Sequence, residues 1–287
     1  MFSNSVQEGK HYSPACVCRN RQYHRPMLAQ PLLLTSPDST ATVYQHGAHV
    51  ATFQPRGQRP VLFMSAKSSY EAGKPIRGGV PVIFPWFGPN PAEATAPAHG
   101  LVRLVDWELE SVDESRLVFG TTAAGCRLTY RVSIGMTLAL ELEVRNVGTA
   151  PTQFEEALHT YFAVSDCRQC TVTGLEQTPY ESKVGETDGS EPIRFTRETD
   201  RLYLNTQSTC VLHDPGWQRR IMVEKSGSDC TVVWNPWIAK AKAMPDFGDE
   251  EWPAMVCIET VNARANAVNL APGKSHTMRQ VVRVNVL

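Results

Sequence analysis

The chain has 287 residues, of which 42% are hydrophobic, so it can bury a core large enough for one or two domains. Its 28 Lys and Arg residues nearly balance 29 Asp and Glu residues, and the net charge of −1 excludes general electrostatic recruitment by nucleic acid or an acidic membrane surface. No stretch approaches the ~20 apolar residues of a membrane span. We therefore expect a cytoplasmic protein without nucleic-acid or membrane partners.

The N-terminal segment differs in character from the rest of the chain. Residues 1–27 are polar and lack the continuous apolar stretch of a secretory signal. Strand-like patterns then run from about residue 32 to the C-terminus without a low-complexity linker. We interpret 1–27 as a partly ordered N-terminal extension and 28–287 as a single domain.

Alternation of apolar and polar residues with a period of two dominates this domain, as in half-buried strands. The clearest example is a pair of alternating segments, 128–134 and 138–144, separated by Gly135 and Met136, which predicts a β-hairpin. Further strands are predicted at 41–54, 116–122, 154–164, 209–213, 219–224, 230–234, 254–260 and 277–286, and a short helical turn at 236–244. With 19 Gly and 20 Pro residues in turns between them, these strands predict an all-β fold, a large antiparallel β-sandwich.

The first segment that does not resemble an ordinary sandwich strand is 74–91, KPIRGGVPVIFPWFGPNP. Arg77 precedes two glycines, which allow backbone amides to approach a ligand closely, and prolines stiffen the loop. Trp86 and Phe87 offer flat apolar surface that can stack on a ring such as a sugar. The alternative is a rigid loop whose aromatic side chains fill the core.

The second such segment is 98–109, AHGLVRLVDWEL. If it is a strand, His99 and Arg103 lie on one face because their separation is even. An arginine there can hold a phosphate or a carboxylate in bidentate fashion. The alternative is that Arg103 pairs with Asp106, with Glu108 or with a residue of a neighbouring strand.

A histidine and a glutamate are candidates for acid–base chemistry. In an extended strand at 154–166, His159 and Tyr161 lie opposite the aliphatic side chains, although a lone strand histidine is more often structural. Glu259 interrupts the apolar segment AMVCIET, and a buried carboxylate is costly unless it is paired or has a raised pKa. The alternative is that Glu259 ends a strand and reaches solvent.

Metal binding is not expected from the eight cysteines. They include two close pairs, Cys16 with Cys18 and Cys167 with Cys170, but the pairs are far apart in the chain and do not match the spacing of a zinc site. We expect reduced thiols packed as small apolar groups.

Several short strings occur in a fixed order between about residues 32 and 286. They are KPIRGGVPVIFPWFG, HGLVR, LHTYF, ETDRLY, VVWNPW followed by MPDF, MVCIE and LAPGKS. In number and order they resemble the hexose-6-phosphate mutarotases, or glucose-6-phosphate 1-epimerases, of the galactose-mutarotase-like (aldose epimerase) superfamily. The resemblance implies a large antiparallel sandwich that interconverts the α and β anomers of hexose 6-phosphates without a metal or organic cofactor.

The resemblance also implies catalytic roles. His159, in the LHTYF string, would be the general acid that protonates the ring oxygen, and Glu259 the general base that removes the proton of the anomeric hydroxyl. Where the family often has Pro-Gly after this glutamate, the present chain has the sequence 260–262, Thr-Val-Asn.

Four more residues match positions that bind substrate in the family. Asp200 would help to hold the sugar, and Arg77 and Arg103 would line the sugar-phosphate pocket with His99 beside it. The expected partner is therefore a small sugar phosphate. The sequence does not specify the oligomeric state, and a monomer is compatible with it.

Two other functions stay open. An aldose 1-epimerase acting on an unphosphorylated sugar would share His159 and Glu259 but would not need Arg77 and Arg103 for phosphate. A non-catalytic carbohydrate-binding sandwich would bind sugar without accelerating anomer exchange. Such a protein would have no need of an acid–base pair.

Overall fold

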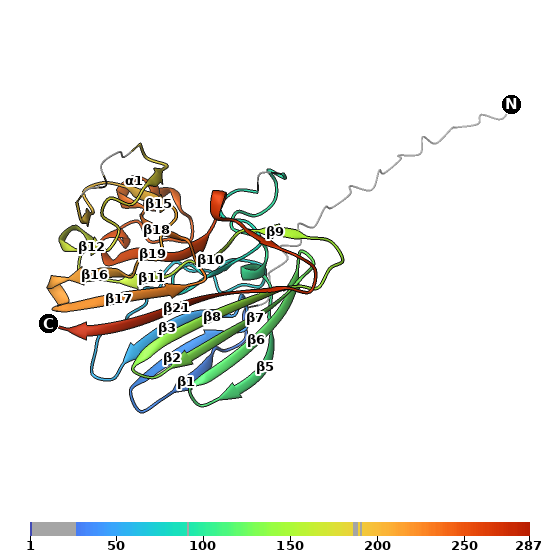
Figure 1. Cartoon of the computed structure of the whole chain (residues 1–287), viewed down its shortest axis with the longest axis horizontal. Helices are drawn as coiled ribbons and strands as arrows, with labels where there is room; N and C mark the ends of the chain where they lie inside the picture. Colours follow the sequence, from blue (N-terminus) through green and yellow to red (C-terminus); the bar gives the residue numbers. More distant parts are fainter. Residues whose placement is uncertain (2–26, 91, 186–188, 190) are drawn as a thin grey trace.

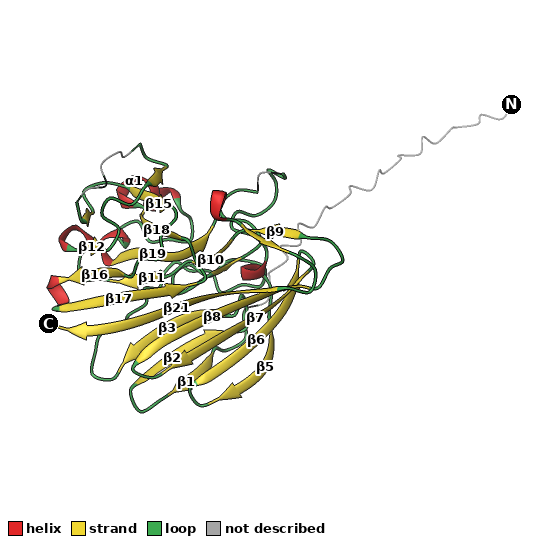
Figure 2. Ribbon diagram, in the orientation of Figure 1, coloured by secondary structure: helices red, strands yellow, loops and turns green. Residues whose placement is uncertain are grey.

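The computed structural model describes residues 1, 27–90, 92–185, 189 and 191–287, and these are almost entirely β structure (Figures 1 and 2). Residues 2–26 of the predicted extension lie outside this part, so the boundary at residue 27 stays a prediction. One described α-helix, α1 (Trp237–Ala243), confirms the helical turn predicted at 236–244. No described helix is long and apolar enough to cross a membrane. The 3-10 helices in the described part are η1 (Val102–Leu104), η2 (Cys167–Gln169), η3 (Pro215–Trp217), η4 (Trp252–Ala254) and η5 (Arg264–Asn266).

The largest sheet has nine antiparallel strands in the order β14-β12-β16-β17-β21-β8-β7-β6-β5. Their bounds are β5 (Glu108–Asp113), β6 (Arg116–Ala123), β7 (Cys126–Ile134), β8 (Thr137–Asn146), β12 (Thr171–Thr173), β14 (Ile193–Arg194), β16 (Cys210–Asp214), β17 (Arg219–Ser226) and β21 (Ser275–Val286). In β7 every second residue is buried, as the alternation in the sequence requires. The hairpin predicted around Gly135 is confirmed, with Ile134 opposite Leu138.

The second sheet has seven antiparallel strands in the order β13-β15-β18-β19-β10-β4, with β11 also pairing with β19. Their bounds are β4 (Val82–Ile83), β10 (Glu156–Leu158), β11 (Tyr161–Ala163), β13 (Tyr180–Ser182), β15 (Thr199–Tyr203), β18 (Cys230–Asn235) and β19 (Met255–Asn262). Every residue of β19 is buried, because this central strand has neighbours on both edges and is covered on both faces. After Glu259 the strand continues through 260–262 and pairs with β10, so the Thr-Val-Asn sequence extends the strand.

Two smaller sheets complete the described structure. A three-stranded sheet contains β1 (Leu32–Thr35), β2 (Ser39–Tyr44) and β3 (His49–Pro55), and a two-stranded sheet contains β9 (Thr152–Phe154) and β20 (Val268–Leu270). The single strand predicted at 41–54 is wrong, because the chain turns between Tyr44 and His49 and β2 pairs with β3. Gly47, at a φ of 68°, lies in this turn.

The single strand predicted at 154–164 is also divided. It comprises the end of β9 followed by β10 and β11. β9 pairs with β20, whereas β10 and β11 both pair with β19, and β10 also pairs with β4. The strand expected after His99 is wrong, since residues 102–104 form the 3-10 helix η1. Most of the other predicted strands correspond closely to strands of the two large sheets, namely 116–122, 209–213, 219–224, 230–234, 254–260 and 277–286.

A buried hydrogen-bonded triad shows how the two large sheets face each other. The amide of Gln280, on β21 of the nine-stranded sheet, donates to the Thr160 hydroxyl at 2.8 Å and accepts from the Thr260 hydroxyl at 2.8 Å. Thr160 and Thr260 therefore point into the sandwich. Since successive side chains of a strand alternate, their neighbours His159 and Glu259 point to the opposite, outer face of the seven-stranded sheet.

Candidate active site

The outer face of the seven-stranded sheet carries a row of side chains that cross four strands. The registers place Asp200 of β15 opposite Trp234 of β18, Trp234 opposite Cys257 of β19, and Cys257 opposite Tyr161 of β11. Residues directly opposite in antiparallel strands share a face, so the four side chains lie side by side. Glu259 is two residues further along β19 and extends this face by one row.

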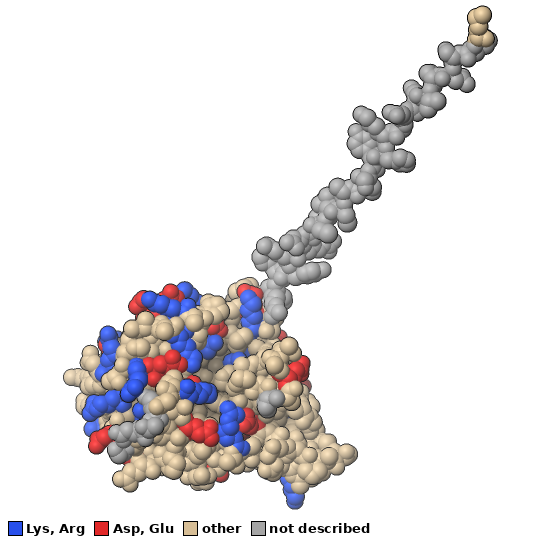
Figure 3. Space-filling model, turned by 90° about the horizontal axis from the view of Figure 1, so that it is seen from above, with Lys and Arg blue, Asp and Glu red and all other residues tan. Residues whose placement is uncertain are grey.

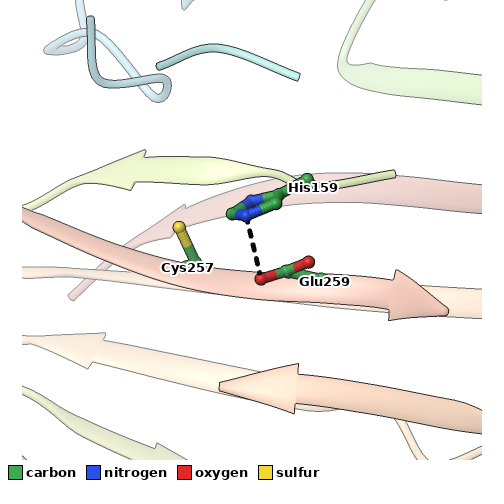
Figure 4. A group of neighbouring side chains, drawn as sticks. All are labelled: His159, Cys257 and Glu259. Atoms are coloured by element: carbon green, nitrogen blue, oxygen red, sulfur yellow. Dashed lines mark ion pairs between the residues drawn. The ribbon is translucent and has the colours of Figure 1, made fainter. Parts of the chain in front are cut away.

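His159 and Glu259 meet on this face (Figure 4). His159 Nε2 lies 3.4 Å from Glu259 Oε1, and the side chains are 9% and 2% exposed. Glu259 is therefore not a strand-end residue that reaches solvent, and His159 has the acidic neighbour that a lone structural histidine lacks. His159 Nδ1 and Glu259 Oε2 are buried without a hydrogen-bond partner among the described residues.

Aromatic rings fix the orientation of the His159 imidazole. Tyr161 stacks on it with centroids 4.8 Å apart and planes at 7°, while His99 and Trp234 meet it edge-on at 5.6 and 6.1 Å. Packing on three sides leaves the ring little rotational freedom. The Nε2 edge is therefore held toward Glu259 and the pocket.

Burial shifts the pKa values of the pair in opposite directions. Burial, followed by the nearby His99, Arg77 and Arg103, lowers the pKa of His159 well below its ordinary value. Burial, followed by the charge of Asp200, raises the pKa of Glu259 well above its ordinary value. Both shifts favour the neutral forms of the two groups.

Arg77 is anchored by two partners. It donates to the Tyr161 hydroxyl at 2.8 Å and forms an ion pair with Asp246 at 3.1 Å. Burial alone would lower the pKa of Arg77, but Tyr161 and Asp246 outweigh it and raise that pKa. The following Gly78, at a φ of 111°, lies so close to residue 63 that a Cβ would be 2.4 Å from the Phe63 carbonyl oxygen. Glycine is therefore required at position 78 because two backbone segments pack closely there. The sequence had predicted a different reason, the close approach of backbone amides to a ligand.

Arg103 has fewer partners. Its guanidinium donates to the Ala98 carbonyl at 2.7 Å, its Nε is buried without a partner, and no ion pair joins it to a carboxylate of the described residues. The alternative pairing with Asp106 is wrong, because that carboxylate bonds to His46. Burial, followed by the neighbouring Arg77, lowers the pKa of Arg103 to about 10, so it stays charged at neutral pH.

His99 reaches the pocket through a turn. Its φ is 63°, and a Cβ on the next residue, Gly100, would lie 1.9 Å from the Phe84 carbonyl oxygen, so only glycine fits there. His99 packs edge-on against Phe87 at 5.0 Å. Burial lowers the pKa of His99 to about 3, which keeps its imidazole neutral beside the arginines.

These side chains surround a cavity of about 260 Å³. All six predicted site residues line it: Arg77, His99, Arg103, His159, Asp200 and Glu259. Of the two aromatic residues predicted to contact a ring, Phe87 lines the cavity, whereas Trp86 does not and donates to the Pro97 carbonyl. The volume is at the small end for ligand pockets and fits a monosaccharide-sized molecule.

The sequence did not identify two lysines at the same cavity. Lys183, just after β13, lies 3.5 Å from Asp200, and Lys240 of α1 lies 3.8 Å from Asp200 and 2.8 Å from Glu198. Neither lysine belongs to a pattern that marks it out. Asp246, which anchors Arg77, lies in the MPDF string, but the sequence does not indicate its role.

Figure 3 shows Lys and Arg interspersed with Asp and Glu on the face seen from above.

Among the described residues, one group of three could hold a metal ion: His159, Cys257 and Glu259, whose donor atoms lie within 4.8 Å of one another. Cys167 and Cys170 are buried free thiols, and burial raises the pKa of both to about 12, which keeps them protonated. The other close pair, Cys16 and Cys18, lies outside the described residues.

The arrangement combines two functions. His159 and Glu259 can act as a proton donor and a proton acceptor and lie 3.4 Å apart. This spacing suits the transfer of one proton to an oxygen atom of a ligand and of another proton from a second oxygen atom on the same carbon. The guanidinium of Arg103 and the ammonium of Lys183 supply positive charge at the same cavity for an anionic group.

Comparison with known proteins gives consistent matches. The family model for aldose 1-epimerase matches residues 31–283. Proteins named “Putative glucose-6-phosphate 1-epimerase” from Escherichia coli and Salmonella typhimurium are each 32% identical, over 88% and 82% of this chain and 90% and 83% of their own length. The crystal structure of a “putative mutarotase (YeaD)” from Salmonella typhimurium superposes with a TM-score of 0.82, at 29% identity over 91% of this chain and 95% of that one.

Proposed function

The chain belongs to the aldose 1-epimerase family of isomerases, and we propose that it interconverts the α and β anomers of hexose 6-phosphates. The observation that carries the proposal is the contact between His159 and Glu259 at 3.4 Å, in a cavity that also presents Arg103 and Lys183. The names of the 32% identical relatives support the same substrate class.

The reaction needs two coupled proton transfers, at the two oxygen atoms bonded to the anomeric carbon C1. The Glu259 carboxylate accepts the proton of the anomeric hydroxyl while protonated His159 donates from Nε2 to the ring oxygen. The bond between C1 and the ring oxygen breaks, and C1 becomes the carbonyl carbon of an open-chain aldehyde. Rotation about C1–C2 presents the other carbonyl face, and closure returns both protons.

The shared proton of the pair fits this cycle. Before ring opening the proton is on His159, and afterwards it is on Glu259, so the pair's total does not change. The open-chain stage leaves both groups neutral, which are the forms that burial favours. The burial of the two side chains thus stabilises the proton distribution that accompanies the intermediate.

Substrate phosphate would also assist the acid. Arg77 and Arg103 contribute to the lowered pKa of His159. A phosphate dianion bound to Arg103 offsets part of that positive field and makes protonation of His159 easier. A phosphorylated sugar would therefore gain more than binding energy from the arginine.

We also place the protein in the cytoplasm, on the support that its six described cysteines are free thiols.

The test compares anomer exchange in the wild-type protein with His159→Gln and Glu259→Gln. Each substitution keeps size and polarity but removes proton transfer, so the exchange rate should fall about 10²–10⁴-fold. Matched controls are His213→Gln and Glu141→Gln, which alter residues on the nine-stranded sheet outside the cavity. Wild-type rates in either pocket variant would contradict the assigned roles.

A further inference from the structure

Cys257 has no part in the proposed reaction, yet it lies beside both groups that do. It precedes Glu259 by two residues on β19 and faces the same side (Figure 4). It is fully buried and does not line the cavity. The Cys257 Sγ, the His159 nitrogen and a Glu259 oxygen all lie within 4.8 Å of one another.

The separations approach those of a tetrahedral metal site. Zinc binds nitrogen and oxygen at about 2.0–2.1 Å and sulfur at about 2.3 Å, so two ligand atoms around it are about 3.3–3.6 Å apart. His159 Nε2 and Glu259 Oε1, at 3.4 Å, already have that spacing. All three donor atoms lie within 4.8 Å of one another, so closing the site around an ion requires movements of about 1 Å.

The chemistry of the three donors selects the ion. Imidazole, thiolate and carboxylate together suit zinc and its neighbours, whereas magnesium and calcium prefer sites built entirely of oxygen. On binding, the Cys257 thiol releases its proton to solvent and forms a sulfur–metal bond, with no change of oxidation state. One thiolate and the Glu259 carboxylate neutralise the two positive charges of the ion. The cavity lined by His159 and Glu259 gives the ion access to the site. Three protein ligands leave the fourth tetrahedral position for water.

We propose that His159, Cys257 and Glu259 form an inhibitory site for zinc or a similar divalent transition metal. The bound ion occupies the Nε2 lone pair of His159, which then cannot carry a proton, and the carboxylate of Glu259, which then cannot accept one. Inhibition rests on the proposed function of this pair, whereas metal binding does not. The ion is a regulator here, and the reaction itself does not use it.

The binding test is a titration of tag-free protein with Co²⁺, which replaces zinc and absorbs visibly in a tetrahedral site with thiolate. We expect one equivalent to give the thiolate-to-metal band, and added zinc to abolish it. Cys257→Ala and Cys257→Ser should both lose the band, and Cys230→Ala, at another buried free cysteine, should keep it. No band in the wild-type protein, or an unchanged band in folded Cys257→Ala, would overturn the site.

The inhibition test measures anomer exchange on glucose 6-phosphate against free zinc in a metal buffer. We expect inhibition that competes with substrate, is reversed by EDTA and is not reproduced by magnesium. Loss of one ligand should raise the inhibitory concentration of zinc for Cys257→Ala about tenfold or more relative to wild type, each compared with its own uninhibited rate. Equal sensitivity of wild type and Cys257→Ala would overturn inhibition through this site. A protein that binds Co²⁺ through Cys257 but exchanges no anomers would instead refute the proposed function alone.

Discussion

Arg103→Ala should separate binding of the phosphate from binding of the sugar. Among the described residues Arg103 has a single hydrogen-bond acceptor, the Ala98 carbonyl, and its Nε is unpartnered, so most of its donors are available to a ligand. Hydrogen bonds to charged groups contribute about 1.5–3 kcal/mol. At about 1.4 kcal/mol for each factor of ten, kcat/KM for glucose 6-phosphate should fall about 10–150-fold.

The same substitution should change kcat/KM for glucose by less than about threefold, because an unphosphorylated sugar presents no dianion to the guanidinium. Arg103→Lys restores the charge without the planar fork and should recover part of the loss. Arg77→Ala is the contrasting variant: it removes the partner of Tyr161 and Asp246 and should impair both substrates and lower the melting temperature.

The assay is the rate of anomer exchange by NMR at several concentrations of each sugar. Equal losses for glucose 6-phosphate and glucose in Arg103→Ala would refute the reasoning. So would a loss in Arg77→Ala that is more specific to glucose 6-phosphate than the loss in Arg103→Ala, since the ion pair with Asp246 would then not be what occupies Arg77.

Three further outcomes follow from the structure. Because His159 and Glu259 must share one proton, kcat/KM should fall at both ends of the pH range, with a broad plateau between them since burial lowers the pKa of His159 and raises that of Glu259; a profile that only rises or only falls while the protein stays folded would contradict this. The hydrogen bond to buried Glu156 raises the pKa of His276. The His276–Glu156 interaction should therefore contribute its full stability to the fold below about pH 6.5, the ordinary pKa of histidine. This contribution to the free energy of unfolding should be lost as the pH rises through the raised pKa. Urea unfolding of His276→Gln should thus differ most from wild type at acid pH, and a difference that grows with pH would be the wrong sign. Leu140→Ala, in the core of β8, should cost about 2–5 kcal/mol of unfolding free energy in urea titrations while leaving kcat/KM at 25 °C within about twofold. A cost below about 1 kcal/mol would contradict the close packing of β8.

The sequence predicted the parts of the fold that depend on local pattern. Alternation in β7 and β8 gave both strands and their hairpin, since each residue's face follows from its parity. Parity also put His159 on the face opposite Leu158. It could not show that 154–164 is divided among three strands, because β9 pairs with β20 while β10 and β11 both pair with β19 and are separated by residues 159–160, and these pairings depend on distant segments.

The site was predictable only in part, for a similar reason. The resemblance supplied six residues that the structure brings to one cavity, although His99 and Arg103 reach it through a turn and a 3-10 helix instead of a strand. Asp246 is 169 residues from Arg77, so its role depends on tertiary contact alone. Lys183 and Lys240 come from a loop and a short helix whose sequences carry no comparable signal.

The most direct measurement of the proposed function is two-dimensional exchange NMR on equilibrated glucose 6-phosphate, with and without a trace of the protein, repeated on glucose. We expect strong exchange between the α and β anomers of glucose 6-phosphate and much weaker exchange of glucose. Comparable exchange of both sugars would point to a general aldose 1-epimerase, and no exchange of either would contradict the assignment of His159 and Glu259 as a working acid–base pair.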